Sequence, residues 1–507
     1  MRRLKRFIFR WLLVVCFVPG AAAWATDNTT AGQELDKEVF AVTKHRLKKD
    51  GLDIRYTATA GYLILKDDHD KHRARMFFIA YEQTGGDKTG RPVTFAFNGG
   101  PGSSSVWLHF GAMGPKRVHL NPNGTGPPPP AVLLDNEFSW LSFTDIVFID
   151  PVGTGYSRAI GEKKEKQFFG VRQDIEAVAD FIRLYCTRYN RWLSPMCIVG
   201  ESYGTMRAVG LAEYLHSRHG IALNGLLLVS PVLDFTTILF DGANDLAYSL
   251  LLPSFTATAW YHTAEQERGP TLTEALDDAE EWVLDRYIER LARGNSLSGK
   301  ERRQLAEEMA ARTGLTPDYI LKNNLRVSDS RYRKELLRST ERILGRMDSR
   351  ITGPGSDAAA DSSRDDPSLE MLIGLFSSAA NSYIRNALEF QSDLPYRYLN
   401  YQAGKAWDWS SALPGGQGYV DVSRTLGDTL RTNGHLKVFI ASGYYDFATP
   451  YFSAKYTVRH LALDEQLQNN IITRQYPAGH MMYIDSVCLK QLTEDVRQFY
   501  TDVLSIP

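Results

Sequence analysis

The chain has 507 residues, of which 43% are hydrophobic and 23% are charged, a composition that allows a large buried core and excludes a disordered chain. Its formal net charge of -1 gives no electrostatic reason to expect nucleic acid as a partner. This length permits two or three domains, or one α/β core that carries an inserted cap.

The first 25 residues have the pattern of a signal peptide. Five basic residues lie between Arg2 and Arg10, an apolar run covers 11–18, and small residues lead up to Ala25. A membrane anchor is the weaker interpretation, because the apolar run is short and is followed at once by Pro19 and Gly20. We predict cleavage after Ala25 and export to the periplasm or out of the cell. Because the segment holds five bases and no acid, the mature chain would have a net charge of -6, and no stable membrane span would remain.

Three cysteines follow this segment, at positions 186, 197 and 488. Cys186 and Cys197 flank a predicted helix-to-strand connection and could form a disulfide, which would leave Cys488 free. Three buried free thiols are at least as compatible with the sequence, because cysteine is common in protein cores.

The first two elements after the signal segment are strands. The apolar segments 54–65 and 75–81 predict two strands joined by the turn 66–73. This turn contains Asp67, Asp68 and His69, which we interpret as part of a solvated turn rather than as a metal site. No metal and no other cofactor is expected.

Shorter apolar runs then recur, each ending near residues typical of turns, as central parallel strands do. They cover 93–97, 146–150, 197–199, 226–229 and 438–441. Helical stretches, notably 171–189, lie between them. Strands that alternate with helices predict an α/β fold in which helices cover both faces of a mostly parallel, twisted sheet.

The alternation stops after Asp234. From 271 to about 389 no convincing strand is found, and helix signals dominate. Thr271 and Ser298 each precede a glutamate by three residues, which is the pattern of a capping box. We therefore predict a signal peptide (1–25), a first part of the core (26–234), a mainly helical cap (235–395) and a second part of the core (396–507).

Gly200-Glu201-Ser202-Tyr203-Gly204 lies between the predicted strand 197–199 and a helical stretch at 206–215. A serine at such a sharp strand-to-helix turn presents its hydroxyl above the sheet, and small residues two positions away on either side let the turn close. Ser202 is therefore the candidate nucleophile.

A serine hydroxyl needs a base to remove its proton, and that base needs a third group to hold its tautomer. In this architecture the acid and then the histidine follow the serine along the chain. Asp446 comes soon after the predicted strand 438–441, and His480 comes soon after the strand-like segment 471–476. Both would lie at carboxyl ends of strands, where open α/β sheets place their sites.

Acyl transfer also needs hydrogen-bond donors aimed at the oxygen that becomes negatively charged. The backbone N–H of Tyr203 is one candidate. The second would come from residues 98–102, Asn-Gly-Gly-Pro-Gly, which follow the predicted strand 93–97. Glycines there allow the backbone to approach a substrate closely.

With these motifs the chain resembles the serine carboxypeptidase family, whose members include carboxypeptidase Y and cathepsin A, and it looks like a bacterial-type exported member. The resemblance covers the predicted core but not the cap. It rests on motifs in the family's order, namely the segments 98–105, 114–115, 150–157 and 200–204 and those around Asp446 and His480.

The resemblance implies an α/β-hydrolase fold and a serine-type enzyme that removes C-terminal residues from peptides without a metal. It implies Ser202 as nucleophile, His480 as base and Asp446 as its partner. Further implied roles are an oxyanion hole formed by the N–H groups of Gly100 and Tyr203, and binding of the substrate's terminal carboxylate by Asn98, Gly99 and Glu201. The oligomeric state stays open.

One departure from the family pattern concerns that carboxylate-binding group. A glutamate facing a substrate carboxylate must be protonated to attract it, and burial favours that state. The family's second glutamate is replaced here by Ala112. We expect a weaker preference for free C-termini or a less acidic pH optimum. A serine esterase or acyltransferase with the same triad is the alternative, and a catalytically idle binding or protective protein is a third.

Overall fold

The structure is a computed structural model that describes residues 37–505, except residues 86, 162–164, 243, 356, 358–359, 363–364 and 413–417. The predicted signal segment, 1–25, lies outside the described residues. Within the described part, no helix combines the length and the apolar character that crossing a bilayer requires.

A ten-stranded sheet forms the centre of the described part. Its strands are β1 (Phe40–Lys49), β2 (Leu52–Lys66), β3 (His72–Gln83), β4 (Val93–Phe97), β7 (Asp145–Ile149), β8 (Arg158–Ala159), β9 (Met196–Glu201), β10 (Gly225–Val229), β13 (Lys437–Gly443) and β14 (Ile471–Tyr476). Their order is β1-β2-β3-β7-β4-β9-β10-β13-β14, and β8 pairs with β3. The β1–β2, β2–β3 and β3–β7 pairs are antiparallel, and from β7 to β14 all neighbours are parallel. The predicted mostly parallel sheet is confirmed.

The α-helices of the described part follow between and after these strands. They are α2 (Val106–Leu108), α3 (Val171–Arg188), α4 (Tyr203–His219), α5 (Asp245–His262), α6 (Leu272–Trp282), α7 (Ile288–Ala292), α8 (Gly299–Thr313), α9 (Pro317–Lys322), α10 (Asp329–Glu335), α11 (Pro367–Ser382), α12 (Tyr401–Lys405), α13 (Ser423–Thr432), α14 (Tyr451–Arg459), α15 (Glu465–Gln468) and α16 (Ser486–Leu504).

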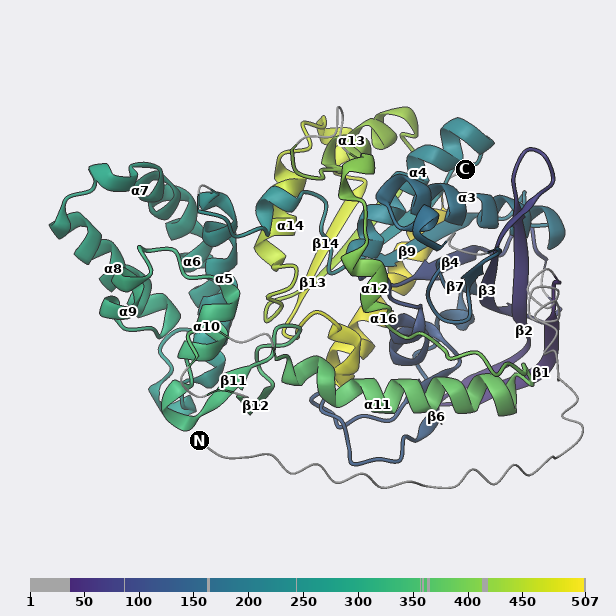
Figure 1. Cartoon of the computed structure of the whole chain (residues 1–507), viewed down its shortest axis with the longest axis horizontal. Coiled ribbons are helices and arrows are strands. Elements are labelled where there is room, and N and C mark those ends of the chain that lie inside the picture. The colour runs from purple at the N-terminus through teal and green to yellow at the C-terminus, as the bar shows by residue number, and fades with distance from the viewer. Residues whose placement is uncertain are drawn as a thin grey trace, which may run out of the picture.

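Successive residues of a strand point to opposite sides of the sheet, and helices cover both sides. Leu226 and Leu228 of β10 belong to the core that the sheet forms with α3, α4 and α13. Leu227 and Val229 belong to the core on the other face, formed with α11 and α16. Figure 1 shows α3, α4 and α13 along the upper side of the sheet and α11 along its lower side. The predicted α/β class, with helices on both faces, is thus confirmed.

The chain between β10 and β13 is rich in helices, as expected. Helices α5 to α10 gather at the left of Figure 1 around a third core, which includes Leu250, Phe255 and Tyr332 and extends to buried residues of α14. The side chains of Thr271 and Ser298 complete both predicted capping boxes with Glu274 and Glu301. The domain boundaries at 234/235 and 395/396 stay a prediction.

The expectation that no strand occurs between 271 and 389 is wrong. Two three-residue strands, β11 (Arg342–Leu344) and β12 (Thr352–Pro354), form an antiparallel hairpin within this stretch. Three residues are too few to show a period of two in the sequence. The turn of this hairpin, 345–351, packs against the candidate site described below.

The disulfide that the sequence left open is absent from the described residues, and Cys186, Cys197 and Cys488 are buried free thiols. Cys186 is part of the core on the α3 and α4 face, whereas Cys197 belongs to the core on the opposite face. The sheet therefore separates the two thiols.

Candidate active site

Ser202 occupies the turn from β9 into α4, with backbone angles of φ 60° and ψ -129°. A non-glycine residue adopts such a conformation only where the surroundings hold it, and functional sites are where such residues concentrate. A Cβ atom at Gly200 would lie 2.1 Å from the carbonyl oxygen of Gly204. The glycine therefore allows strand and helix to meet closely enough for this turn to form.

The loop after β4 packs directly against the beginning of α4. A Cβ atom at Gly99 would lie 2.5 Å from the backbone nitrogens of both Tyr203 and Gly204. Tyr203 is the first residue of α4, and the first N–H groups of a helix have no partner within the helix. The two segments predicted to supply oxyanion donors are thus adjacent.

The predicted base and acid are in direct contact. The Nδ1 atom of His480 donates to Oδ2 of Asp446 at 2.7 Å, and both side chains are buried. Asp446 also accepts hydrogen bonds from the N–H groups of Ala448 and Thr449, both at Oδ1, and from the Thr449 hydroxyl at Oδ2. With Nδ1 donating to Asp446, Nε2 of His480 is the ring nitrogen available as a base.

Two opposing effects act on the protonation of His480. Burial by itself would lower the pKa of the imidazole, but the charge of Asp446 and the hydrogen bond to it outweigh burial, so that the pKa is raised. The charge of Glu201 acts in the same direction, and that of Arg346 opposes it. The Asp446 carboxylate is therefore placed to stabilise an imidazolium.

Three hydrogen bonds from two other segments hold the loop that carries His480. The N–H of His480 donates to the carbonyl of Met347 at 2.6 Å, and the carbonyl of His480 accepts from the Ser230 hydroxyl at 2.6 Å. The N–H of Gly479 donates to the carboxylate of Asp348 at 3.2 Å. Met347 and Asp348 belong to the turn between β11 and β12, so a segment far away in the sequence supports the catalytic loop.

Arg350 completes this support as the centre of an ion-pair group that is largely, though not fully, removed from solvent. Its guanidinium contacts Asp348 at 2.7 Å and Asp485 at 3.1 Å, and it donates to the carbonyl of Pro477 at 2.8 Å. Sequence reasoning missed Met347, Asp348 and Arg350, because no local motif marks a contact across about 130 residues.

Replacing Arg350 with alanine is expected to lower the free energy of unfolding by about 3–5 kcal/mol, because two nearly buried carboxylates lose their shared counter-ion. Urea unfolding checks this. Arg424→Ala is the control, since the Arg424–Asp428 pair is exposed, and its loss should change stability by less than about 0.5 kcal/mol. Equal effects of the two substitutions would contradict the assigned role of Arg350.

One cavity of about 520 Å³ brings most of the predicted residues together. It is lined by seven of the eight predicted residues, Asn98, Gly99, Gly100, Glu201, Ser202, Tyr203 and His480. The eighth, Asp446, is fully buried behind His480. Apolar side chains such as Trp107, Phe235 and Trp409 form much of the remaining wall, and two cationic residues, Arg346 and Lys405, also line it.

Glu201 is buried at the edge of this cavity, and burial raises the pKa of its carboxyl to about 7. The charge of His480 and hydrogen bonds from Tyr483 and Asn98 oppose this rise. The Tyr483 hydroxyl donates to Oε2 of Glu201 at 2.6 Å. Sequence reasoning missed Tyr483, which no pattern distinguishes from an ordinary core tyrosine.

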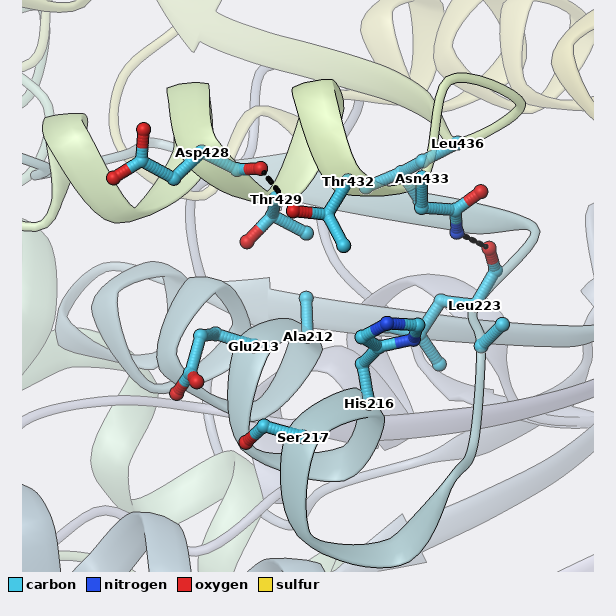
Figure 2. Close-up of a pocket in the computed structure, with 11 residues that line it drawn as sticks. Ala212, Glu213, His216, Ser217, Leu223, Asp428, Thr429, Thr432, Asn433 and Leu436 are labelled. Atoms are coloured by element: carbon cyan, nitrogen blue, oxygen red, sulfur yellow. Dashed lines mark hydrogen bonds between the residues drawn. The ribbon is translucent and has the colours of Figure 1, made fainter.

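A second cavity, of about 340 Å³, lies between α4 and α13 (Figure 2). His216, Asp428 and Asn433 are among its lining residues, and Asn433 donates to the carbonyl of Leu223. None of the predicted site residues lines it. The predicted chemistry therefore belongs to the cavity lined by Ser202 and not to this one.

Similarity to known proteins agrees with this geometry. The family model described as serine carboxypeptidase matches residues 50–486. Serine carboxypeptidase-like 45 of Arabidopsis thaliana is 29% identical over 186 residues, which are 35% of this chain and 37% of that protein. Carboxypeptidase Y homolog A of Phaeosphaeria nodorum is 30% identical over 181 residues, which are 35% of this chain and 30% of that protein. The chain thus matches about a third of the length of these curated relatives.

A solved structure is similar over a greater length. The prohormone-processing carboxypeptidase of Saccharomyces cerevisiae has a TM-score of 0.52 and 17% identity, with 93% of each chain covered. This likeness, together with the sheet order, shows the α/β-hydrolase fold. With a family match that extends over residues 50–486, the chain belongs to the serine carboxypeptidase family.

Proposed function

We propose that the protein is a serine-type carboxypeptidase that removes C-terminal residues from peptides through an acyl-enzyme on Ser202. The observation that carries this proposal is the pair formed by Asp446 and His480 at 2.7 Å, with His480 and Ser202 lining the same cavity. The family membership of the chain supports the same conclusion.

In the first half of the reaction, Nε2 of His480 takes the proton of the Ser202 hydroxyl while the serine oxygen attacks the carbonyl carbon of the last peptide bond. The carbonyl oxygen becomes negatively charged and accepts hydrogen bonds from the N–H groups of Gly100 and Tyr203. His480 then gives its proton to the leaving amine, and the C-terminal residue departs. Water repeats these steps on the acyl-enzyme and restores the serine.

Asn98, Gly99 and Glu201 are proposed to receive the terminal carboxylate of the peptide. Oδ1 of Asn98 accepts from the N–H of Leu108, so its NH₂ group is the donor; one hydrogen of that group bonds to Glu201, and the second is left for the substrate. Neutral Glu201 adds a second donor, whereas ionised Glu201 would repel the substrate.

The activity on free C-termini should therefore depend on the protonation of Glu201. Because its pKa is about 7, the carboxyl is protonated below this pH and ionised above it. We expect kcat/KM for peptides with a free terminal carboxylate to fall above about pH 7. Measured pH profiles of such peptides and of uncharged ester substrates check this.

Glu201→Gln is the matched variant, because glutamine keeps a donor and carries no charge at any pH. We expect that kcat/KM of this variant for free-carboxylate peptides no longer falls above about pH 7. A fall of the same size for uncharged esters in the unaltered protein would show that Glu201 is not its cause.

An esterase or acyltransferase with the same triad is the second candidate, because Ala112 provides no carboxyl for a second carboxylate-binding acid and the cavity wall is largely apolar. Mass spectrometry of an unmodified peptide after incubation separates the two. A carboxypeptidase yields a ladder that shortens from the C-terminus, whereas rapid ester turnover without such a ladder would favour the alternative. We further propose that the protein is exported, on the basis of the predicted signal segment.

A further inference from the structure

Glu201 is held from behind by a residue that does not line the cavity. Tyr483 lies in the short 3₁₀ helix Met482–Ile484, just after His480, and its hydroxyl donates to Oε2 of Glu201 at 2.6 Å. Its side chain is 1% exposed and that of Glu201 is 3% exposed, so water does not compete for this bond.

The backbone around Gly111 makes room for the tyrosine ring. A Cβ atom at Gly111 would lie 2.6 Å from Cε2 and 2.7 Å from Cδ2 of Tyr483. Gly111 belongs to the π-helical turn His109–Met113, which thus passes close against the ring. The next residue, Ala112, has no carboxyl group, and the side-chain donor on Oε2 of Glu201 is the phenol of Tyr483.

Four charged or polar residues act on the protonation of Glu201, namely His480, Tyr483, Asn98 and Asp446. Burial is the main cause of its raised pKa, and the charge of Asp446 adds to the rise. The charge of His480 and the hydrogen bonds from Tyr483 and Asn98 lower it. Of these groups Tyr483 takes no part in the proton transfers of the mechanism, so the role of its hydroxyl is the hydrogen bond to Glu201.

We propose that Tyr483 is a positioning residue that orients the carboxyl group of Glu201 and decides how readily it holds a proton beside the terminal carboxylate of a peptide. The inference rests on the proposed function, because it needs Glu201 to face that carboxylate. Since Oε2 accepts from the phenol, a proton on Glu201 is directed to Oε1, where it can be donated to substrate. A phenol hydrogen bond also favours the ionised carboxylate, which keeps the group able to titrate near neutral pH.

Tyr483→Phe tests this, because it removes the hydroxyl and keeps the ring that packs against Gly111. We expect the alkaline limb of kcat/KM for free-carboxylate peptides to move up by about one pH unit, since a hydrogen bond to the ionised form is lost. KM for these peptides at acidic pH should rise severalfold, because the carboxyl is no longer oriented. Esters without a free carboxylate should keep their profile.

Tyr81→Phe is the matched control, because Tyr81 is also a buried tyrosine of the same core and its hydroxyl is 2.8 Å from Nε2 of His109. It should leave the alkaline limb in place. An unchanged limb in Tyr483→Phe, or an equal shift with esters, would overturn the role of Tyr483.

A measurement without substrate keeps this inference separate from the proposed function. Infrared titration of the carboxyl band that disappears in Glu201→Gln reports the protonation of Glu201 directly. A midpoint that rises in Tyr483→Phe supports the proposal even if no peptide is cleaved, and an unchanged midpoint contradicts it even if peptides are cleaved.

Discussion

Replacing Ser202 with alanine is expected to lower kcat on peptides by about a millionfold, because the oxygen that forms the acyl-enzyme is removed. The backbone contacts of this turn do not use the side chain, since the Ser202 N–H donates to Val229 and its carbonyl accepts from Thr205. We therefore expect little change in stability. Kinetics and thermal unfolding of the purified variant provide the check.

Activity of this variant that remains within tenfold of the unaltered protein would assign the chemistry to another residue. A large loss of stability would instead show that the substitution had altered the fold of the turn. The two outcomes are distinguished because kcat is measured on folded protein.

Asp446→Asn is expected to lower kcat by about 10⁴-fold through the wrong histidine tautomer. In this site the N–H groups of Ala448 and Thr449 both donate to Oδ1, so the oxygen of the new amide occupies that position and the NH₂ group takes the place of Oδ2. Its NH₂ group then points at Nδ1 of His480, which becomes an acceptor. The proton moves to Nε2, and the base for Ser202 is lost.

The pH profile gives a second check of the same variant. The charge of Asp446 raises the pKa of His480 against the effect of burial. Without that charge the pKa falls, so the acid limb of the residual activity should move to lower pH. An acid limb that stays in place would contradict the Asp446–His480 assignment.

Asp145→Asn is the control for removing a buried carboxylate. Asp145 is paired with Arg191 at 2.6 Å and is about as buried as Asp446, but its carboxylate bonds to Gln83, Arg91 and Arg191 and not to the catalytic histidine. Its substitution should cost stability and leave kcat of the folded protein unchanged.

Much of the core could be predicted because buried parallel strands leave a local signal. The strands 93–97 and 471–476 agree with β4 and β14 at both ends. The candidate catalytic residues follow such strands, so placing the strands also placed Ser202, Asp446 and His480 at one edge of the sheet.

Elements with weak local signals could not be predicted in this way. The strand β1 was missed because it lies at the edge of the sheet and only one of its residues, Leu47, is buried, so its sequence is rich in charge. The helix α4 begins at Tyr203, three residues before the predicted start, because Gly204 and Thr205 are weak helix formers that the packing of the turn places in a helix.

Contacts between distant segments left no signal at all. The turn that holds the His480 loop lies more than 120 residues earlier in the chain, and its residues Asp348 and Arg350 resemble ordinary surface charges in the sequence. Tyr483 is recognised only when its hydroxyl is seen on Glu201.

The most direct test of the convergence of Ser202, Asp446 and His480 is labelling with a fluorophosphonate, followed by peptide mapping. We expect one covalent adduct, on Ser202, and labelling that is nearly abolished in His480→Ala. An adduct on another serine, or undiminished labelling without His480, would contradict the proposed active site.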